Sequence, residues 1–566
     1  MWTRRRHRLL PQQSNKPMTG NTAPSEWWRG AVIYQIYPRS FLDTDGNGIG
    51  DIKGITGKLD YVASLGVDAI WLSPFFKSPM KDYGYDVADY CDVDPLFGTL
   101  ADFKTMLDKA HSLNMKIIID LVLSHTSDEH PWFTESRSSR TNPKSDWYVW
   151  ADPQPDGSPP TNWQSVFGGS SWSFDIRRGQ YYLHNFLQEQ PDLNLHNPDV
   201  ETALFKAMEF WLDMGVDGFR LDAAAHYFHK QDLKDNPPNP NPAPSSFNIA
   251  FPTPFTMQLH ENDISLPHTI AFMKKVRTLL DRYDDRMAVA EIGGDDGILL
   301  AAQFTDGPAM LHTAYNFSLI SGDKASAAKI RDTLEYFHSL PYKGWPSWAF
   351  SNHDVVRVAS RWHPDKTGYN HDDRLSKTLI ALLGCLQGSV FLYQGEELGL
   401  PEATLTFEQI QDPWGKFLYP AWQGRDGCRT PMPWDSKAPH AGFGTATPWL
   451  PIPAEHLHLS VNVQEKDPDS ALNFTRRFMA WRKEQPALRG SDIQFLDTDT
   501  DNLLAFTRTE GAQTILCVFN FADTPQNFKF DGDIKGGEAI FTAGALSGHK
   551  QGQTITLPPY GLFVSA

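Results

Sequence analysis

The feature that most constrains this chain is a set of eight short apolar runs, separated by stretches long enough for helices and often ending in polar or acidic residues. Repeated βα units give this pattern, because each buried parallel strand is followed by a covering helix. Eight such units close into a TIM-type (β/α)8 barrel, an α/β fold. The predicted strands are Val32–Tyr37, Asp68–Ser73, Lys116–Leu123, Gly218–Asp222, Met287–Ile292, Ala314–Leu319, Ser347–Ser351 and Val390–Tyr393.

The intervals between the runs indicate the domain organisation. Leu100–Leu113 and Val200–Met214 carry apolar residues at helical spacing. The interval after the third strand is nearly a hundred residues long, which predicts an inserted subdomain at 126–197 within a barrel made of 26–125 and 198–487. From about residue 488 short alternating runs broken by Gly, Asp and Asn predict a C-terminal antiparallel β-sandwich, 488–566.

Charge and the N-terminal segment restrict the partners and the location. A net charge of -17 excludes nucleic acid and anionic membranes as favoured partners, and suits a neutral small-molecule substrate. Residues 1–25 are predicted to be a disordered leader, since the basic start is not followed by the apolar stretch of a signal peptide. With no transmembrane span and four cysteines lacking a CxxC pair, we expect a cytoplasmic protein with reduced thiols. The oligomeric state is not predicted.

Three acidic residues lie at or just beyond the C-terminal ends of predicted strands: Asp222, Glu291 and Asp354. In a (β/α)8 barrel, catalytic groups lie at the C-terminal ends of the strands. A single one of these acids reads equally well as a salt-bridged structural residue. Because a buried unpaired carboxylate is costly, three of them together favour a catalytic site.

Several separate motifs resemble those of glycoside hydrolase family 13, the α-amylase family, and in particular its α-glucosidase and oligo-1,6-glucosidase members. The resemblance extends over nearly everything from Trp27 onward. The motifs are Ala31–Phe41, Asp120–His125, Gln190–Asn194, Gly218–Asp222, Glu291 and Asn352–Asp354.

The resemblance implies that Asp222 is the nucleophile, Glu291 the general acid/base, and Asp354 the residue that holds sugar hydroxyls and stabilises the transition state. Arg220 lies two positions before Asp222, so both side chains point to the same face of a strand, and its charge favours the ionised nucleophile. Glu291 needs a raised pKa to begin protonated. A separation of about 5 Å between the two carboxyls would give net retention.

The resemblance also implies a glucose pocket closed at its non-reducing end, and hence exo-action. In this pocket His125 and His353 would contact sugar hydroxyls. The pocket would be closed by Asp82 and Arg429, with Tyr85 as a stacking floor. The alternative for these histidines and charges is a structural or separate surface role. The substrate-binding candidates are Asp82, Tyr85, His125, Phe167, Phe186, Arg220, His353 and Arg429.

Two features bear on the leaving group. Among the relatives, Val directly after the nucleophile accompanies α-1,6 preference and a smaller Thr or Ala accompanies α-1,4, so Ala223 favours α-1,4 bonds. The loop from Asn236 to Pro254 is crowded with Pro and Asn and should be stiff. We hypothesise that it borders the leaving-group subsite and limits acceptors to short ones, the alternative being a mobile surface linker.

An oxygen-rich loop follows the first predicted strand and suits a hard cation, with Gly48 at the sharp turn. Position twelve is Gly54 where an EF-hand has Glu, so the loop resembles instead the family's single structural calcium loop; magnesium is the alternative. The candidate ligands are Asp43, Asp45, Asn47, Ile49 and Asp51.

Together these features predict an exo-acting retaining α-glucosidase that releases glucose from short α-1,4-linked glucosides such as maltose, with transglucosylation as a side activity. The enzyme alternatives are an oligo-1,6-glucosidase, a sucrose isomerase and a glucosyltransferase, which share the covalent intermediate. The non-enzyme alternative is a catalytically inactive binding subunit, disfavoured because all three acids are present.

Overall fold

The structure is a computed structural model that describes residues 26–242, 247, 249–294, 296–363, 372–530, 532 and 541–565. The segment predicted as a leader, 1–25, lies outside the described residues, as do 243–246 and 248 of the Pro- and Asn-rich loop.

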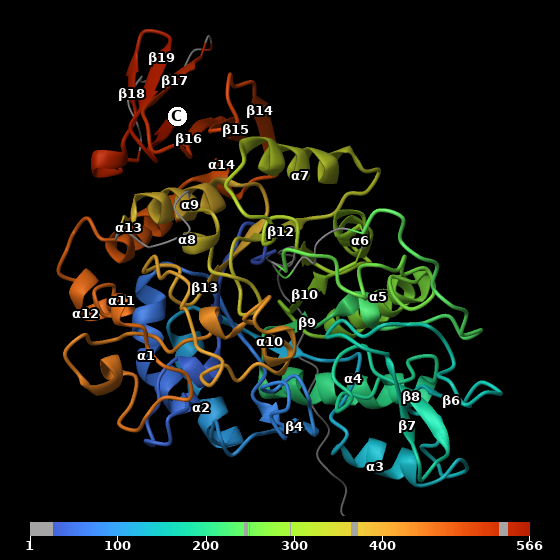
Figure 1. Cartoon of the computed structure of the whole chain (residues 1–566). Helices are drawn as coiled ribbons and strands as arrows, with labels where there is room; N and C mark the ends of the chain where they lie inside the picture. Colours follow the sequence, from blue (N-terminus) through green and yellow to red (C-terminus); the bar gives the residue numbers. More distant parts are fainter. Residues whose placement is uncertain are drawn as a thin grey trace, which may run out of the picture.

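Eight parallel strands close into a barrel in the order β1-β13-β12-β11-β10-β9-β5-β2 (Figure 1). Each of them coincides with one of the apolar runs, so the predicted barrel is confirmed. Residues at alternate strand positions, Ile33, Trp71, Ile118, Val289 and Phe391 among them, form one buried cluster that fills the barrel. The strands are β1 Val32–Ile36, β2 Ala69–Leu72, β5 Lys116–Leu121, β9 Gly218–Leu221, β10 Met287–Ile292, β11 Thr313–Asn316, β12 Pro346–Ala349 and β13 Ser389–Tyr393.

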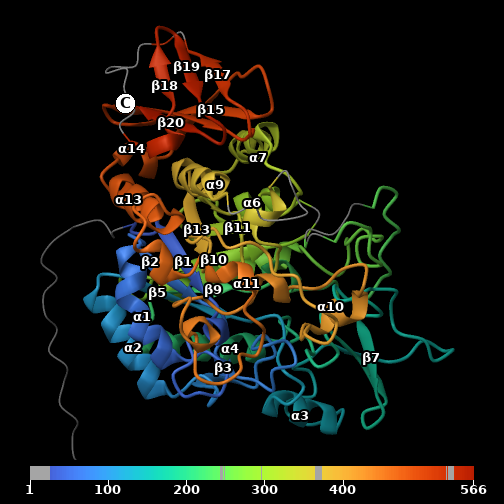
Figure 2. The same ribbon diagram turned by 60° about the vertical axis from the view of Figure 1, so that its left-hand side comes forward.

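Helices pack around the barrel (Figures 1 and 2). The two helices predicted from periodicity are confirmed as α2 and α4. A capping box between Thr99 and Asp102 begins α2, and Gly215, with φ 107°, ends α4 in the left-handed conformation that glycine tolerates. The helices of the barrel region are α1 Ile52–Ser64, α2 Leu100–Ser112, α4 Pro198–Met214, α5 Pro267–Leu280, α6 Gly297–Phe304, α7 Ala327–Ser339, α8 Val358–Arg361 and α9 Arg374–Cys385.

Short elements extend the loops at the C-terminal ends of the strands. A two-stranded antiparallel pair, β3 Phe76–Lys77 and β4 Asp89–Val93, follows β2. The remaining short elements are η1 Pro38–Ser40, η2 Ala224–His226, α10 Pro413–Leu418, η3 Asp426–Cys428, η4 Pro439–Gly442, α11 Ala454–Leu457 and α12 Val461–Gln464.

The segment between β5 and α4 carries α3 Pro131–Ser138 and a small antiparallel sheet, β6 Trp150–Ala151, β8 Gln180–Leu183 and β7 Trp172–Asp175. It projects from one side of the barrel (Figure 2). Isolated bridges from His125 to Asp192 and from Tyr148 to Leu193 hold the two ends of the segment together.

The chain ends in two antiparallel sheets, which confirms the predicted sandwich (Figure 2). Apolar residues from both sheets, such as Leu516 and Ile555, form its core. The helices α13 Ala471–Lys483 and α14 Pro486–Arg489 lead into it, and η5 Gly544–Leu546 lies within it. One sheet contains β14 Asp492–Leu496, β15 Leu503–Glu510, β16 Gln513–Asn520 and β20 Leu562–Ser565; the other contains β17 Gln526–Lys529, β19 Thr554–Leu557 and β18 His549–Gln551.

Among the described helices, none combines the length and the apolar character needed to cross a bilayer.

Candidate active site

Arg220 on β9 lies at the centre of the charged residues at the C-terminal end of the barrel. Strand register explains its neighbours, because Arg220 pairs with Asp120 on β5 and with Val289 on β10, two residues before Glu291. Its guanidinium contacts Asp120 at 2.8 Å and Glu291 at 2.5 Å, and it also binds Asp222. The Arg220 side chain is fully buried, so one cation faces three carboxyl groups away from water.

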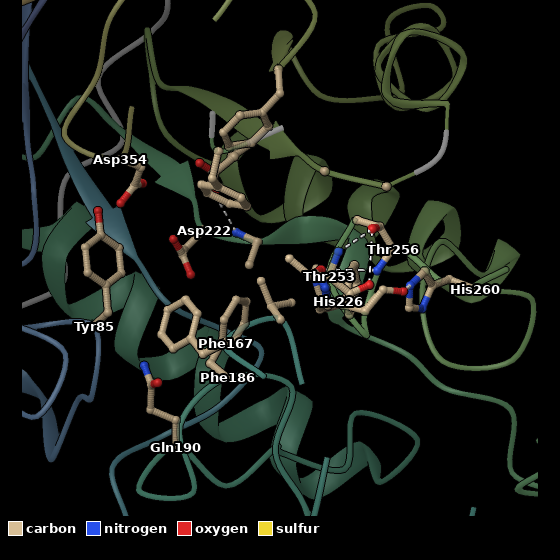
Figure 3. Close-up of a pocket in the computed structure, with 18 of the residues that line it drawn as sticks. Tyr85, Phe167, Phe186, Gln190, Asp222, His226, Thr253, Thr256, His260 and Asp354 are labelled. Atoms are coloured by element: carbon tan, nitrogen blue, oxygen red, sulfur yellow. Dashed lines mark hydrogen bonds between the residues drawn. The ribbon is translucent and has the colours of Figure 1, made fainter. Parts of the chain in front are cut away.

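These groups lie at a cavity of about 450 Å³ that the carboxyls of Asp222, Glu291 and Asp354 line. The structure therefore brings the three predicted catalytic acids together. Figure 3 shows Asp222 and Asp354 near Tyr85 at one end of the cavity. Glu291 accepts hydrogen bonds from the Ala223 backbone N–H at 3.1 Å and from the Tyr315 hydroxyl at 3.1 Å.

The three acids differ in their electrostatic surroundings. Burial raises the pKa of Asp222 to about 7, with Arg220 opposing the shift. Burial, together with the charges of Asp222 and Asp354, raises the pKa of Glu291 to about 7 against Arg220. The pKa of Asp354 is instead lowered, because His353, Arg425 and Arg429 outweigh its burial. Asp354 thus stays ionised, while Asp222 and Glu291 are poised to share a proton near neutral pH.

An arginine not assigned from the sequence, Arg425, closes one end of the cavity. It contacts Asp82 at 2.8 Å and Asp354 at 3.3 Å, and it lines the cavity with both of them. Gln190 also lines this end and donates to Asp82 at 3.2 Å. Gln190 begins the Gln190–Asn194 motif, but the sequence alone did not predict a binding role for it.

The pocket-closing position predicted for Arg429 is corrected by the structure. Arg429 lies behind Asp354, 2.9 Å from its carboxylate, and donates to the His353 carbonyl at 2.7 Å, so it supports the cavity wall instead of lining it. The two arginines flank the single turn η3, which turns Arg425 toward the cavity and Arg429 away from it. The path of the backbone through η3 therefore decides which of the two arginines lines the cavity and which supports its wall.

The two predicted histidines occupy different depths. His125 lines the cavity and receives a contact from Gln190 at 3.1 Å. His353 is not a lining residue: it is fully buried behind Tyr85, with the two rings stacked at 5.3 Å and its Nε2 2.6 Å from the Tyr85 hydroxyl. Burial lowers the pKa of both histidines to about 3, so both rings are neutral at physiological pH. His353 therefore contacts two lining residues, Tyr85 and the Asp354 carboxylate 3.2 Å from its Nε2, without lining the cavity itself.

Tyr85 is itself a lining residue, as predicted, and its hydroxyl donates to Asp120 at 3.1 Å. The predicted aromatic residues Phe167 and Phe186 line the middle of the cavity, with ring centroids 5.5 Å apart (Figure 3).

The far wall of the cavity comes from a segment that includes the Pro- and Asn-rich loop. Figure 3 shows Thr253, Thr256 and His260 on this side, opposite Asp354 and Tyr85. None of these residues belongs to a recognisable motif. The sequence indicated this region only through the hypothesis that the Asn236–Pro254 loop borders the leaving-group subsite. The residues of this segment that line the cavity are Asn239, Asn241, Phe247, Thr253, Phe255, Thr256, Leu259 and His260.

The loop after β1 gathers the predicted acidic ligands. Carboxylate oxygens of Asp43, Asp45 and Asp51 all lie within 4.8 Å of one another, an oxygen donor set that fits a hard cation. Asn47 lies beside them, donating to Asp45 at 3.1 Å, and its side-chain oxygen accepts from the Ile49 backbone N–H at 2.8 Å.

Comparison with known proteins agrees with this geometry. The family model for the α-amylase catalytic domain matches residues 35–491, and the model for the maltogenic amylase C-terminal domain matches residues 493–564.

Individual relatives cover nearly the whole chain. A probable alpha-glucosidase of Rhizobium meliloti (strain 1021) is 51% identical over 499 residues, 88% of this chain and 90% of its own. An oligo-1,6-glucosidase of Heyndrickxia coagulans is 37% identical over 539 residues, 89% of this chain and 94% of its own. The crystal structure of the alpha-glucosyl transfer enzyme XgtA is 48% identical and superposes with a TM-score of 0.90, over 96% of this chain and 99% of that one. The chain therefore belongs to the α-amylase family, glycoside hydrolase family 13, as an α-glucosidase-like glycoside hydrolase.

Proposed function

We propose that the protein is an exo-acting retaining α-glucosidase that releases glucose from the non-reducing end of short α-1,4-linked glucosides such as maltose. The observation that carries the proposal is the shared contact of Asp222 and Glu291 with Arg220, at a cavity that Asp82 and Arg425 close at one end.

The reaction would proceed in two displacements. In the first, the Asp222 carboxylate attacks the anomeric carbon while protonated Glu291 gives its proton to the departing glycosidic oxygen. In the second, the Glu291 carboxylate takes a proton from water, whose oxygen displaces Asp222 and restores the acid. The raised pKa values of both carboxyls support this exchange, because one proton between them leaves one acid and one nucleophile near neutral pH.

The closed end of the cavity supports exo-action. Asp82, Arg425 and Asp354 form a connected set of charges with Tyr85 beside them, a wall suited to the hydroxyls of one terminal glucose. The ionised Asp354 can accept hydrogen bonds from those hydroxyls. A longer chain cannot pass through this wall, so the scissile bond is the first one.

Ala223 supports the α-1,4 assignment. It lines the cavity directly after Asp222, in the left-handed conformation with φ 43°, and its N–H binds Glu291. A β-branched residue in this conformation is strained and fills more of the cavity. The small methyl group leaves room beside the acid/base for an α-1,4-linked leaving group.

The Pro- and Asn-rich loop supports a preference for short substrates, because Asn239, Asn241 and Thr253 line the cavity wall opposite Asp354. We also propose that the loop after β1 holds one structural calcium ion through Asp43, Asp45, Asn47, Asp51 and the backbone of Ile49. Bound there, the ion would neutralise the clustered carboxylates and brace the loop.

The test compares glucose release from maltose and from isomaltose, and uses proton NMR to follow the anomer of the glucose first released from 4-nitrophenyl α-glucoside, whose leaving group is not a sugar. Faster release from maltose supports the linkage, and initial α-glucose from the aryl glucoside supports retention. Asp222→Ala is the control and should abolish release from all three substrates. Faster release from isomaltose overturns the linkage, and initial β-glucose from the aryl glucoside overturns the retaining mechanism.

Glucosyl transfer to an acceptor other than water is the second candidate, favoured by the 48% identity to an alpha-glucosyl transfer enzyme. The same reaction mixtures test it, because transfer produces trisaccharides while hydrolysis produces glucose alone.

A further inference from the structure

We propose that the leaving-group half of the cavity is built for an aromatic alcohol, so that the enzyme transfers glucose to phenol-type acceptors more readily than to a second sugar. This inference rests on the proposed retaining mechanism and adds an acceptor class to it.

The first observation is the aromatic character of this half. Around His226, Phe255 lies at 6.4 Å and Phe186, from the middle of the cavity, at 5.3 Å. Phe247 and Phe317, 5.0 Å apart, line the same cavity. Phe255 lines the same region, as does Leu259. Aromatic faces of this kind stack on flat rings and add to the free energy of apolar burial.

The second observation is that most of the polar side chains described on the wall are already bonded within the protein. The Thr256 hydroxyl accepts from the Thr253 backbone N–H at 2.9 Å and donates to the Thr253 carbonyl at 3.2 Å. The Asn239 amide donates to the Thr256 carbonyl at 3.1 Å, while its oxygen accepts from the Asn241 N–H at 3.0 Å. The Thr256 hydroxyl thus has its one donor in use, and Asn239 has one of its two amide hydrogens and one lone pair in use, which leaves less bonding capacity for a ligand.

His260 follows the same pattern. Its Nδ1 lies 3.0 Å from Asp263 and its Nε2 lies 3.0 Å from the Phe255 carbonyl, so both nitrogens are used. The His260 ring also stacks on Phe255 with centroids 3.8 Å apart, which fixes the orientation of the phenylalanine.

His226 differs from its neighbours on the wall. It lines the cavity directly after the catalytic strand, and both of its ring nitrogens are buried without a hydrogen-bond partner among the described residues. Burial lowers the pKa of His226 to about 4, so the neutral ring offers one donor and one acceptor. One such group matches a single hydroxyl or ether oxygen.

A second sugar fits this surface less well. Its apolar face can stack on the phenylalanines, but several hydroxyls would lose water without gaining protein partners, and each such loss is unfavourable. A phenol places one ring on the aromatic wall and keeps its only hydroxyl for the reaction.

The transfer step balances without a further reagent. The acceptor oxygen forms a bond to the anomeric carbon as the bond from that carbon to Asp222 breaks, and the acceptor proton goes to the Glu291 carboxylate. The product is an aryl α-glucoside, and both carboxyls return to their initial states.

The experiment uses the full chain with α-glucosyl fluoride as donor, because fluoride does not compete as an acceptor. Two acceptors are compared, 4-methoxyphenol and methyl β-glucoside, and the concentration of each that diverts half of the glucosyl groups from water is measured. We expect 4-methoxyphenol to reach this point at about tenfold lower concentration, which corresponds to about 1.4 kcal/mol. Equal concentrations, or a lower one for the sugar, overturn the inference.

Variants locate the effect. Phe255→Ala should reduce the preference for the phenol toward unity, and Phe255→Leu, which keeps apolar volume but not the flat face, should reduce it partly. The control is Phe174→Ala, a half-exposed phenylalanine on β7, which should keep the wild-type preference. An unchanged preference in both Phe255 variants removes this wall from the proposed role.

The same assay separates this inference from the proposed function. If the wild type releases no fluoride from the donor, the retaining glucosidase assignment fails. Fluoride release with a sugar acceptor preferred leaves that assignment intact and overturns only the acceptor class.

Discussion

Arg220 and Glu291 are joined by a 2.5 Å contact at the base of the cavity, and the same guanidinium also binds Asp222 and Asp120. One positive charge cannot balance three buried carboxylates, so protonation of one carboxyl relieves the excess negative charge. Arg220 therefore links the protonation of Glu291 to the ionisation of Asp222.

The first prediction concerns the pH dependence of the wild-type enzyme. Because the pKa values of Asp222 and Glu291 are both raised to about 7, kcat/KM for maltose should follow a narrow bell near neutral pH. Activity falls on the acid side as Asp222 gains a proton and on the alkaline side as Glu291 loses one. A flat plateau from pH 5 to 9 would contradict the shared-proton arrangement.

Asp120→Asn tests the same network with a defined sign. The charge of Asp120 raises the pKa of Asp222, so its removal should move the acid limb of the profile to lower pH. Asp120 also accepts hydrogen bonds from Trp71 and Tyr85, so we expect a loss of about 1–3 kcal/mol in stability. Asp217→Asn, a buried acid just before the first residue of β9, is the matched control: it should lower Tm without moving the profile.

Arg425→Lys tests the closed end of the cavity. Lysine keeps the charge but loses the planar fork that bridges Asp412, Asp82 and Asp354. We expect inhibition by the product glucose to weaken about tenfold, equivalent to about 1.4 kcal/mol of binding. Unchanged inhibition would show that Arg425 does not help to hold the terminal glucose.

The sequence predicted the barrel well because buried parallel strands are continuous apolar runs, and the acids follow those runs directly. Glu291 and Asp222 sit within or next to a strand, so a strand assignment also places them. Arg425 lies more than thirty residues after β13 in irregular backbone, where no periodicity indicates a direction. Its place beside Asp82 depends on contacts between segments far apart in the chain.

The wall opposite Asp354 was equally hard to resolve from sequence. Composition drew attention to the Asn236–Pro254 loop, but Phe255 and His260 are ordinary residues in any local reading. Whether these side chains can bind a ligand depends on which of their polar atoms already form hydrogen bonds inside the protein, as His260 does with Asp263. Those bonds follow from the three-dimensional structure and cannot be recognised in the local sequence.

Ala223 supplies the fourth prediction. Ala223→Val places a β-branched residue at φ 43° beside Glu291, which should cost about 1–3 kcal/mol in stability. The larger side chain should also lower the ratio of maltose to isomaltose cleavage. Ala223→Gly is the control, because glycine tolerates this conformation and should raise Tm slightly. If the ratio of maltose to isomaltose cleavage is unchanged in Ala223→Val, residue 223 does not determine the linkage preference.

The final prediction concerns the loop after β1, which braces a distant part of the chain. The Asp43 backbone N–H donates to the Phe443 carbonyl at 2.8 Å, and the Trp449 N–H donates to the Gly48 carbonyl at 2.9 Å. A cation held by Asp43, Asp45 and Asp51 would therefore stabilise both segments, by about 2.7 kcal/mol at a hundredfold excess over Kd. Calcium added to chelator-treated protein should raise Tm and leave kcat unchanged.

Variants and a second cation sharpen that test. Asp45→Asn should weaken the response of Tm to calcium, because it removes one of the clustered charges. Asp156→Asn, another exposed aspartate on a loop, is the control and should respond like the wild type. Magnesium in place of calcium identifies the preferred ion, since the smaller cation demands a tighter octahedral shell. If neither ion changes Tm at millimolar concentration, the acidic loop is held by its own hydrogen bonds alone.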